Sequence, residues 1–276
     1  MDSIDFYYFS GTGNTLLIAQ RVAEVFKRRG FNVTLKRMEC ANQPLIIDKE
    51  HLVGLAFPVA GSTYPFVWDF INALPDVSGT KIFMVDTFAG YSKGIVGPLK
   101  KVLMKKGYET IGAKEIIMPS NIFYICSERT NSGIIKKGLK TAEEYAEEII
   151  SGASRWGRVS FLSDFIYFCF RQIVRRMWFG GWHQRLFGFK VNKVKCTKCG
   201  VCVQSCPVRN IRMEEFPVFG AKCNFCLRCV SLCPPKAIPC KFNYKGKTYT
   251  AARPGLMEQM NISEGPISQT ETFTGT

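Results

Sequence analysis

The feature that most constrains this chain is a cysteine pattern that occurs twice in its C-terminal third. Each copy reads C-x2-C-x2-C-x3-C-P, and the second begins 27 residues after the first. The eight cysteines are Cys196, Cys199, Cys202 and Cys206 in the first copy, and Cys223, Cys226, Cys229 and Cys233 in the second. A repeat with this spacing supplies soft thiolate ligands from tight loops, which favours a metal or redox centre over ordinary packing.

The spacing is that of bacterial four-iron centres, in which the final Cys-Pro of each copy points to the other copy's cluster. The predicted ligands of the first [4Fe-4S] cluster are Cys196, Cys199, Cys202 and Cys233, and those of the second are Cys223, Cys226, Cys229 and Cys206. Gly200 and Asn224 lie in the two-residue gaps and tolerate turn conformations. Pro207 and Pro234 stop the local chain from continuing as helix.

Two structural zinc sites are the alternative interpretation, but zinc ribbons use paired C-x2-C units without the x3-C-P extension. A segment of about 40 residues has too little apolar core to fold alone, so we expect it to be unfolded without iron and sulfide. Residues 190–240 resemble the two-cluster bacterial ferredoxins.

The remaining composition limits the class of protein. The chain has 12 cysteines in 276 residues but no secretory-signal pattern after Met1. We therefore expect a cytoplasmic location, and we do not expect a disulfide framework. No apolar run reaches the roughly 18 residues of a spanning helix. The four isolated cysteines, which we expect to be inert, are Cys40, Cys126, Cys169 and Cys240. His51 and His183 are the only histidines, which argues against acid–base catalysis by histidine.

The N-terminal end reads as a strand, a polar loop and a helix. Apolar residues 4–9 form the strand, and the helix pattern ends with basic residues 27–29 and Gly30. The loop between them consists of Ser10, Gly11, Thr12, Gly13, Asn14 and Thr15. Backbone N–H groups and hydroxyls at a helix N-terminus bind anions. The loop lacks the lysine of a nucleotide P-loop and the third glycine of the dinucleotide pattern, so we expect it to hold the phosphate of flavin mononucleotide (FMN).

This loop resembles that of the flavodoxins, which carry [S/T]-x-T-G-x-T after the first strand. A generic strand-to-helix turn with small residues is the alternative. The rest of the N-terminal half alternates as the resemblance implies, with further strands expected at 31–37, 52–58, 80–87 and within 107–119, and a closing helix at 133–150. The predicted fold class is therefore α/β, a flavodoxin-like doubly wound five-stranded parallel sheet, followed by a C-terminal two-[4Fe-4S] ferredoxin-like domain.

Two further loops leave strands at the edge where such sheets bind ligands. The resemblance implies that they bracket the flavin ring, and their candidate residues are Pro58, Val59, Ala60 and Gly61 after the third strand, and Thr87, Phe88, Ala89, Gly90, Tyr91 and Gly94 after the fourth. The glycines allow close backbone approach or positive φ. Tyr64, Phe88 and Tyr91 either stack on the ring or pack within their loops. Residues 118–121 are a further candidate for closing the site.

Residues 155–195 form a join that is rich in arginine, lysine and aromatic residues. Such a stretch, and 161–187 in particular, suits either an anionic membrane surface or a helical arm packed on the first domain, and we favour the arm. The predicted organisation is an FMN domain at 1–152, a basic aromatic helical linker at 153–189, a two-cluster domain at 190–245 and a tail at 246–276 whose end is mobile.

The formal charge of +15 counts the cysteines as neutral. Two clusters and one flavin phosphate would bring it to about +9, which still attracts an acidic redox partner such as a ferredoxin or an electron-transfer enzyme. Nucleic acid is the usual partner of a basic protein, but no recognised nucleic-acid-binding module is present.

The chain resembles flavodoxin–ferredoxin fusion proteins over nearly its whole length. The resemblance implies an electron carrier that passes single low-potential electrons between two [4Fe-4S] clusters and FMN, and on to or from a redox partner. An FMN-dependent oxidoreductase that reduces a bound small molecule is the second hypothesis, and a membrane-associated redox subunit is the third. Linking one-electron clusters to a flavin that accepts one or two electrons makes their exchange intramolecular.

Overall fold

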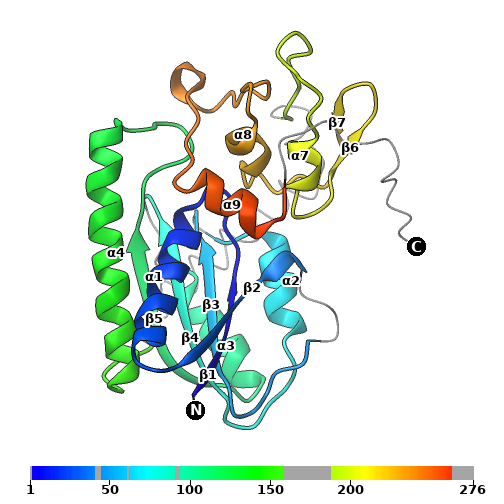
Figure 1. Cartoon of the computed structure of the whole chain (residues 1–276). Helices are drawn as coiled ribbons and strands as arrows, with labels where there is room; N and C mark the ends of the chain where they lie inside the picture. Colours follow the sequence, from blue (N-terminus) through cyan, green and yellow to red (C-terminus); the bar gives the residue numbers. More distant parts are fainter. Residues whose placement is uncertain (1, 41–44, 61, 91–93, 158–187, 263–276) are drawn as a thin grey trace.

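The computed structural model describes residues 2–40, 45–60, 62–90, 94–157 and 188–262. It contains an α/β domain built on a five-stranded sheet and a smaller lobe that carries the cysteine repeat. Figure 1 shows the lobe seated over one end of the sheet, opposite the chain's N-terminus.

The five strands are β1 (Ser3–Tyr8), β2 (Asn32–Arg37), β3 (Leu52–Pro58), β4 (Lys81–Phe88) and β5 (Glu109–Ile117). All neighbouring pairs are parallel, and the strand order is β2-β1-β3-β4-β5. This is the strand order of the flavodoxin-like fold, whose ligand site lies where the order reverses, between β1 and β3. The predicted sheet is confirmed, with strand ends shifted by one or two residues.

Helices cover both faces of the sheet, as Figure 1 shows. On one face lie α1 (Asn14–Arg28) and α4 (Glu128–Ile150), whose apolar residues share a core with β1, β3 and β4. On the other lie α2 (Pro65–Ala73) and α3 (Val96–Lys105). The central strands β3 and β4 are buried along almost their whole length, as expected for parallel strands covered on both sides.

The lobe contains α7 (Val201–Gln204), α8 (Arg228–Leu232) and the antiparallel pair β6 (Ile211–Met213) and β7 (Pro217–Phe219). A 3-10 turn, η2 (Tyr244–Gly246), and helix α9 (Arg253–Gln259) follow. Figure 1 shows α9 between the lobe and the sheet domain. The lobe therefore sits at the carboxyl ends of the strands, where the ligand loops emerge.

Two segments differ from the sequence prediction. Helix α4 begins five residues before the predicted start, because Ser127 caps it and its hydroxyl accepts a bond from the N–H of Thr130 at 3.3 Å. The predicted tail contains α9, and its residues Leu256, Met257 and Ile262 are buried against the core around α1.

Of the predicted linker, the structure describes both ends. Trp156 is buried against the sheet domain, and its indole N–H donates to the carbonyl oxygen of Val96 at 3.0 Å. Cys169, His183 and the aromatic stretch 161–187, for which an arm or a membrane contact was predicted, lie outside the described residues.

Candidate functional site

The loop between β1 and α1 has the backbone that an anion site needs. Gly13 adopts φ 97°, which an L side chain rarely tolerates, and its N–H donates to the Ser10 hydroxyl oxygen at 3.1 Å. The first N–H groups of α1 face the loop, because the first turn of a helix has no internal acceptor for them. No acidic residue lies in that turn. The helix start therefore favours a bound anion.

Hydroxyl groups on the loop are held in place and still have protons to donate. Asn121 donates to the Thr12 hydroxyl oxygen at 3.1 Å, and the hydroxyls of Thr15 and Thr87 lie 2.8 Å apart. A hydroxyl that accepts one bond keeps its own proton free to rotate. In the threonine pair one hydroxyl donates to the other, and one proton remains. Ser10, Thr12 and one threonine can therefore each donate to a phosphate, so this donor set fits the group without a lysine or a metal ion.

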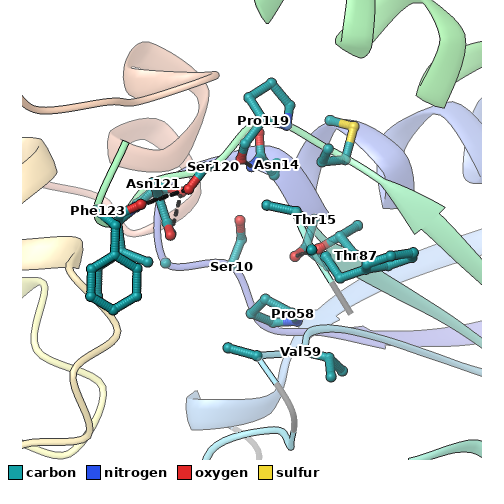
Figure 2. A pocket seen from close by; sticks show the side chains of 18 of the residues that line it. Ser10, Asn14, Thr15, Pro58, Val59, Thr87, Pro119, Ser120, Asn121 and Phe123 are labelled. Atoms are coloured by element: carbon teal, nitrogen blue, oxygen red, sulfur yellow. Dashed lines mark hydrogen bonds between the residues drawn. The ribbon is translucent and has the colours of Figure 1, made fainter. Parts of the chain in front are cut away.

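The predicted ligand loops meet around one cavity of about 770 Å³. Its lining includes these residues predicted from the sequence: Ser10, Gly11, Thr12, Asn14, Thr15, Pro58, Val59, Ala60, Thr87, Phe88, Ala89, Gly90 and Gly94. Figure 2 shows the hydroxyl groups of Ser10, Thr15 and Thr87 around the hollow, with Pro58 and Val59 below them. A volume of this size is typical of small-molecule and cofactor sites.

Other candidates lie elsewhere. Gly13 does not line the cavity and instead faces the C-terminal segment, where an added Cβ would lie 2.6 Å from the backbone nitrogen of Ala252. Gly61 and Tyr91 lie outside the described residues. Gly90 does line the cavity, and its φ is not positive.

The stretch after β5 contributes more of the cavity than the sequence indicated. Residues 118–121 were candidates, but Ile122, Phe123, Tyr124 and Cys126 also line it. Phe123 and Tyr124 are 63% and 66% exposed, so they form an aromatic rim at the opening. Cys126, one of the four cysteines expected to be inert, also lies on this wall. Two adjacent aromatic residues after a predicted strand were the only sequence signal for this rim.

The cysteine repeat forms two separate cavities, and each is lined by four of its thiols. The first cavity is lined by Cys196, Cys199, Cys202 and Cys233. The second is lined by Cys206, Cys223, Cys226 and Cys229. The fourth cysteine of each copy thus lies with the first three of the other. This is the crossed grouping that the spacing predicts for two cubane clusters.

The electrostatic neighbours of the thiols follow the same grouping. Burial raises the pKa of the Cys202 thiol to about 12, and the thiols that raise it further belong to Cys233, Cys199 and Cys196. Burial also raises the pKa of Cys229 well above its usual value, and its thiol neighbours are Cys226, Cys223, Cys202 and Cys206. Cys202 and Cys229 are thus neighbours across the two groups. Iron would displace the protons that these buried thiols retain.

Backbone turns are the same in both copies. Residues 198 and 225, 200 and 227, and 209 and 236 all have positive φ, and each pair is separated by the 27-residue repeat. The final cysteines match too: Cys206 accepts from the N–H of Asn210, and Cys233 from that of Ala237, both at 3.2 Å. The sequence had indicated Asn224 as the turn residue of the second copy. The structure instead gives positive φ to Phe225 and Leu227.

The cavity of the α/β domain and the second cysteine cavity share a wall. A Cβ added to Gly11 would collide with the carbonyl oxygen of Cys226. Tyr64 lines the cavity of the α/β domain and is partly buried, and its pKa is raised by desolvation and then by the neighbouring Cys226 thiol. The rim is also bonded to the lobe, since Phe123 donates to the Asn243 side chain at 3.1 Å. Cys240 is buried beside Asn243.

Within the described residues, no three His, Cys, Asp or Glu side chains are grouped tightly enough to hold a single metal ion. None of the helices described is long and apolar enough to cross a bilayer.

Comparison with known families identifies the lobe. Residues 189–234 match the family described as 4Fe-4S dicluster domain. The match contains all eight cysteines of the two cavities. No curated protein matches the chain.

Solved structures similar to the α/β domain include flavodoxins. A flavodoxin of Streptococcus pneumonia TIGR4 is 18% identical, with a TM-score of 0.40, over 54% of this chain and 98% of its own. The Megasphaera elsdenii flavodoxin is 24% identical, with a TM-score of 0.38, over 51% and 98%. Flavodoxin 1 of Bacillus cereus is 17% identical, with a TM-score of 0.41, over 52% and 97%. At these values the fold assignment rests on the observed strand order rather than on the likeness.

The lobe is thus a two-cluster iron–sulfur domain, and the sheet before it has the flavodoxin-like order of strands. The chain thus combines the two folds of a flavodoxin–ferredoxin fusion protein.

Proposed function

We propose that this protein passes single low-potential electrons between its two [4Fe-4S] clusters and an FMN held in the 770 Å³ cavity, and on to or from a redox partner. The observation that carries the proposal is the shared wall: Gly11 of the phosphate loop lies against the backbone of Cys226, a predicted cluster ligand. Because both sites lie on one chain and their backbones are in contact here, electron exchange between them would be intramolecular.

The chain's own residues perform three tasks. Ser10, Thr12 and the Thr15–Thr87 pair supply hydroxyl donors for the phosphate. Pro58, Val59 and the rim around Phe123 bound the apolar part of the cavity and limit the access of water. FMN, when bound, supplies a group that accepts electrons one or two at a time.

The test is a Cys199→Ser variant, purified without oxygen and loaded with FMN. We expect it to lose the spectrum of one cluster and to reduce FMN more slowly with electrons from a reduced ferredoxin. Unchanged FMN reduction in a variant that has lost the cluster would contradict the proposed route.

We also propose that the partner is acidic and binds at the lobe's basic edge. Lys190, Lys193, Lys195 and Lys198 are exposed along one short stretch next to the first cysteine cavity. Val194 lies among them and is 97% exposed. A basic surface around an apolar residue beside a redox centre suits brief association with an acidic electron-transfer protein, such as a ferredoxin, by electrostatic steering.

This docking surface predicts a clear dependence on salt. A Lys190→Gln/Lys195→Gln variant should associate several-fold more slowly with a reduced acidic ferredoxin at low ionic strength, and the difference should vanish at about 1 M salt. Lys137→Gln, an exposed lysine on α4, is the matched control. Equal slowing by the control variant would rule out this stretch as the docking surface.

A second candidate function is reduction of a bound small molecule by FMN. The exposed aromatic residues Phe123 and Tyr124 and the thiol of Cys126 favour it, because they extend the cavity beyond the phosphate and ring loops. A Phe123→Ala variant that loses reduction of an added acceptor but keeps electron exchange with a ferredoxin would support an enzyme. Parallel loss or retention of both would support a carrier.

A further inference from the structure

The two cysteine repeats carry different residue types at one position between their cysteines, and cluster binding does not require this difference. Arg228 of the second repeat corresponds to Val201 of the first. Arg228 is only 2% exposed, although a buried arginine is rare unless its charge is paired. Its side chain leaves the lobe and enters the α/β domain.

Every group around the guanidinium belongs to the junction between the two domains. Nε and Nη2 donate to the carbonyl oxygen of Ser10 at 3.1 and 2.7 Å. Nη1 donates to Glu39 at 2.8 Å and to the carbonyl oxygen of Ser205 at 3.2 Å. The guanidinium carbon lies 4.7 Å from the centre of the Phe9 ring. Because the fork is rigid and planar, these bonds fix helix α8 relative to the phosphate loop.

The same residue lies beside a ligand of the second cluster. Arg228 lies two residues after Cys226 and directly before Cys229, and all three residues are buried. A cluster that gains an electron becomes more negative, so a nearby positive charge raises its reduction potential. Buried Val201 supplies no charge at the matching place in the first repeat.

We propose that the cluster held by Cys206, Cys223, Cys226 and Cys229 is the one that exchanges electrons with the flavin. Arg228 is the positioning residue that seats this cluster on the phosphate loop and keeps its potential above that of the other cluster. The inference rests on the proposed function and adds an order of centres to it.

Cys196, Cys199, Cys202 and Cys233 would hold the cluster that accepts one electron from an external low-potential iron–sulfur protein. Cys206, Cys223, Cys226 and Cys229 would hold the cluster that receives this electron and delivers it to the flavin, so that each cluster would return to its oxidised state. Two such electrons and two protons from solvent would complete the reduction of the flavin.

The test uses full-length protein loaded with clusters but stripped of flavin, titrated electrochemically and followed by electron paramagnetic resonance. Glu39→Gln/Arg228→Met removes both charges of the buried pair, so neither is left unpaired. We expect one cluster signal to become about tenfold harder to reduce, which is about 59 mV for a one-electron couple, and the other to stay unchanged. Lys198→Gln, at an exposed lysine between two ligands of the other cluster, should shift the other signal by about twofold.

Arg228→Lys separates charge from geometry and serves if the double variant does not fold. It keeps the cation but loses the fork on the Ser10 carbonyl. We expect the cluster potential to stay within about twofold of the parent, while the dissociation constant of FMN, measured by fluorescence, rises about tenfold. If Arg228 had only a structural role, Arg228→Lys would not weaken FMN binding while leaving the cluster potential near that of the parent.

Three results would overturn the proposal. The first is a shift of both cluster signals in the double variant, and the second is a shift of the same signal in the double variant and in Lys198→Gln. The third is an unchanged FMN affinity in Arg228→Lys. Failure of the parent chain to bind FMN would instead overturn the proposed function itself. FMN binding by the parent with unshifted potentials in the double variant overturns only the role of Arg228.

Discussion

The two cysteine repeats have nearly the same backbone and different surroundings. Positive φ occurs at three matched positions, and the last cysteine of each repeat accepts the same N–H bond. The side chains between the ligands diverge, with Lys198, Gly200 and Val201 in one repeat and Phe225, Leu227 and Arg228 in the other. The backbone thus follows from the need to wrap four thiols around a cluster, while the side chains follow from what each loop faces.

Leu227 shows how strong the backbone requirement is. The first repeat places Gly200 at φ 72°, where glycine has no steric cost, but the second places a buried leucine there at φ 60°. A non-glycine residue in this region costs about 1–2 kcal/mol. The second repeat tolerates that cost because Leu227 packs in the lobe's core and the following Arg228 reaches the α/β domain.

Iron removal tests whether the shared backbone depends on the clusters. We expect a chelator under reducing conditions to abolish hydrogen-exchange protection throughout residues 190–240, because iron binding contributes most of the folding free energy of so small a segment. The amides of β3 and β4 are the internal control and should remain protected. A lobe that stays protected without iron would show that its backbone is fixed by packing alone.

Glu39→Gln tests the contact that only the second repeat makes. The substitution leaves the buried guanidinium of Arg228 without its charge partner, which should cost about 3–5 kcal/mol. Hydrogen exchange of the α8 amides measures this as a lower opening free energy.

The matched control is Glu143→Gln, which breaks the partly exposed pair with Arg21 and should cost about 0–1 kcal/mol. Equal effects in the two variants would mean that the Arg228 contact does not anchor the second repeat.

Gly11→Ala tests the wall between the second repeat and the cavity. The added methyl group would collide with the carbonyl oxygen of Cys226, so the loop and the cluster segment must separate. We expect FMN to bind at least tenfold more weakly, about 1.4 kcal/mol, by fluorescence titration, with a change in one cluster's resonance signal. Gly90→Ala, also on the cavity but with open space around it, should leave both cluster signals unchanged. If Gly90→Ala changed a cluster's resonance signal and Gly11→Ala did not, the contact between Gly11 and the second repeat would not be the wall that separates the two sites.

Gly200→Ala has the smallest expected effect, about 1 kcal/mol, because it places a side chain at positive φ in the first repeat. Iron release to a chelator should become a few-fold faster for one cluster. Gly133→Ala, in an open position on α4, should not change iron release. Unchanged release from Gly200→Ala would show that the repeat accommodates alanine there as readily as it does Leu227.

The sequence predicted the parts of the molecule in which one local pattern determines the outcome. Apolar runs, or alternating apolar residues in the case of 31–37, predicted the five strands. The loop from Ser10 to Thr15 indicated the anion site because its glycines and hydroxyls are contiguous. Cysteine spacing predicted the crossed grouping, because thiol ligands of one cubane leave few alternatives.

The contacts between distant segments left no such pattern. Arg228 appears in the sequence as one more basic residue among many, and only the fold brings it to the Ser10 carbonyl. Helix α9 has a short apolar face, with Leu256 and Met257 surrounded by polar residues, so it read as part of a tail. Tyr64 was one of three aromatic candidates, and only the fold shows that it packs in the same apolar cluster as Cys226.

Analysis of bound iron, acid-labile sulfide, zinc and flavin in protein purified without oxygen tests the account most directly. We expect about eight iron and eight sulfide per chain, the content of two four-iron clusters, with one FMN and no stoichiometric zinc. Zinc in place of iron and sulfide, or fully assembled clusters in a chain that binds no FMN, would contradict it.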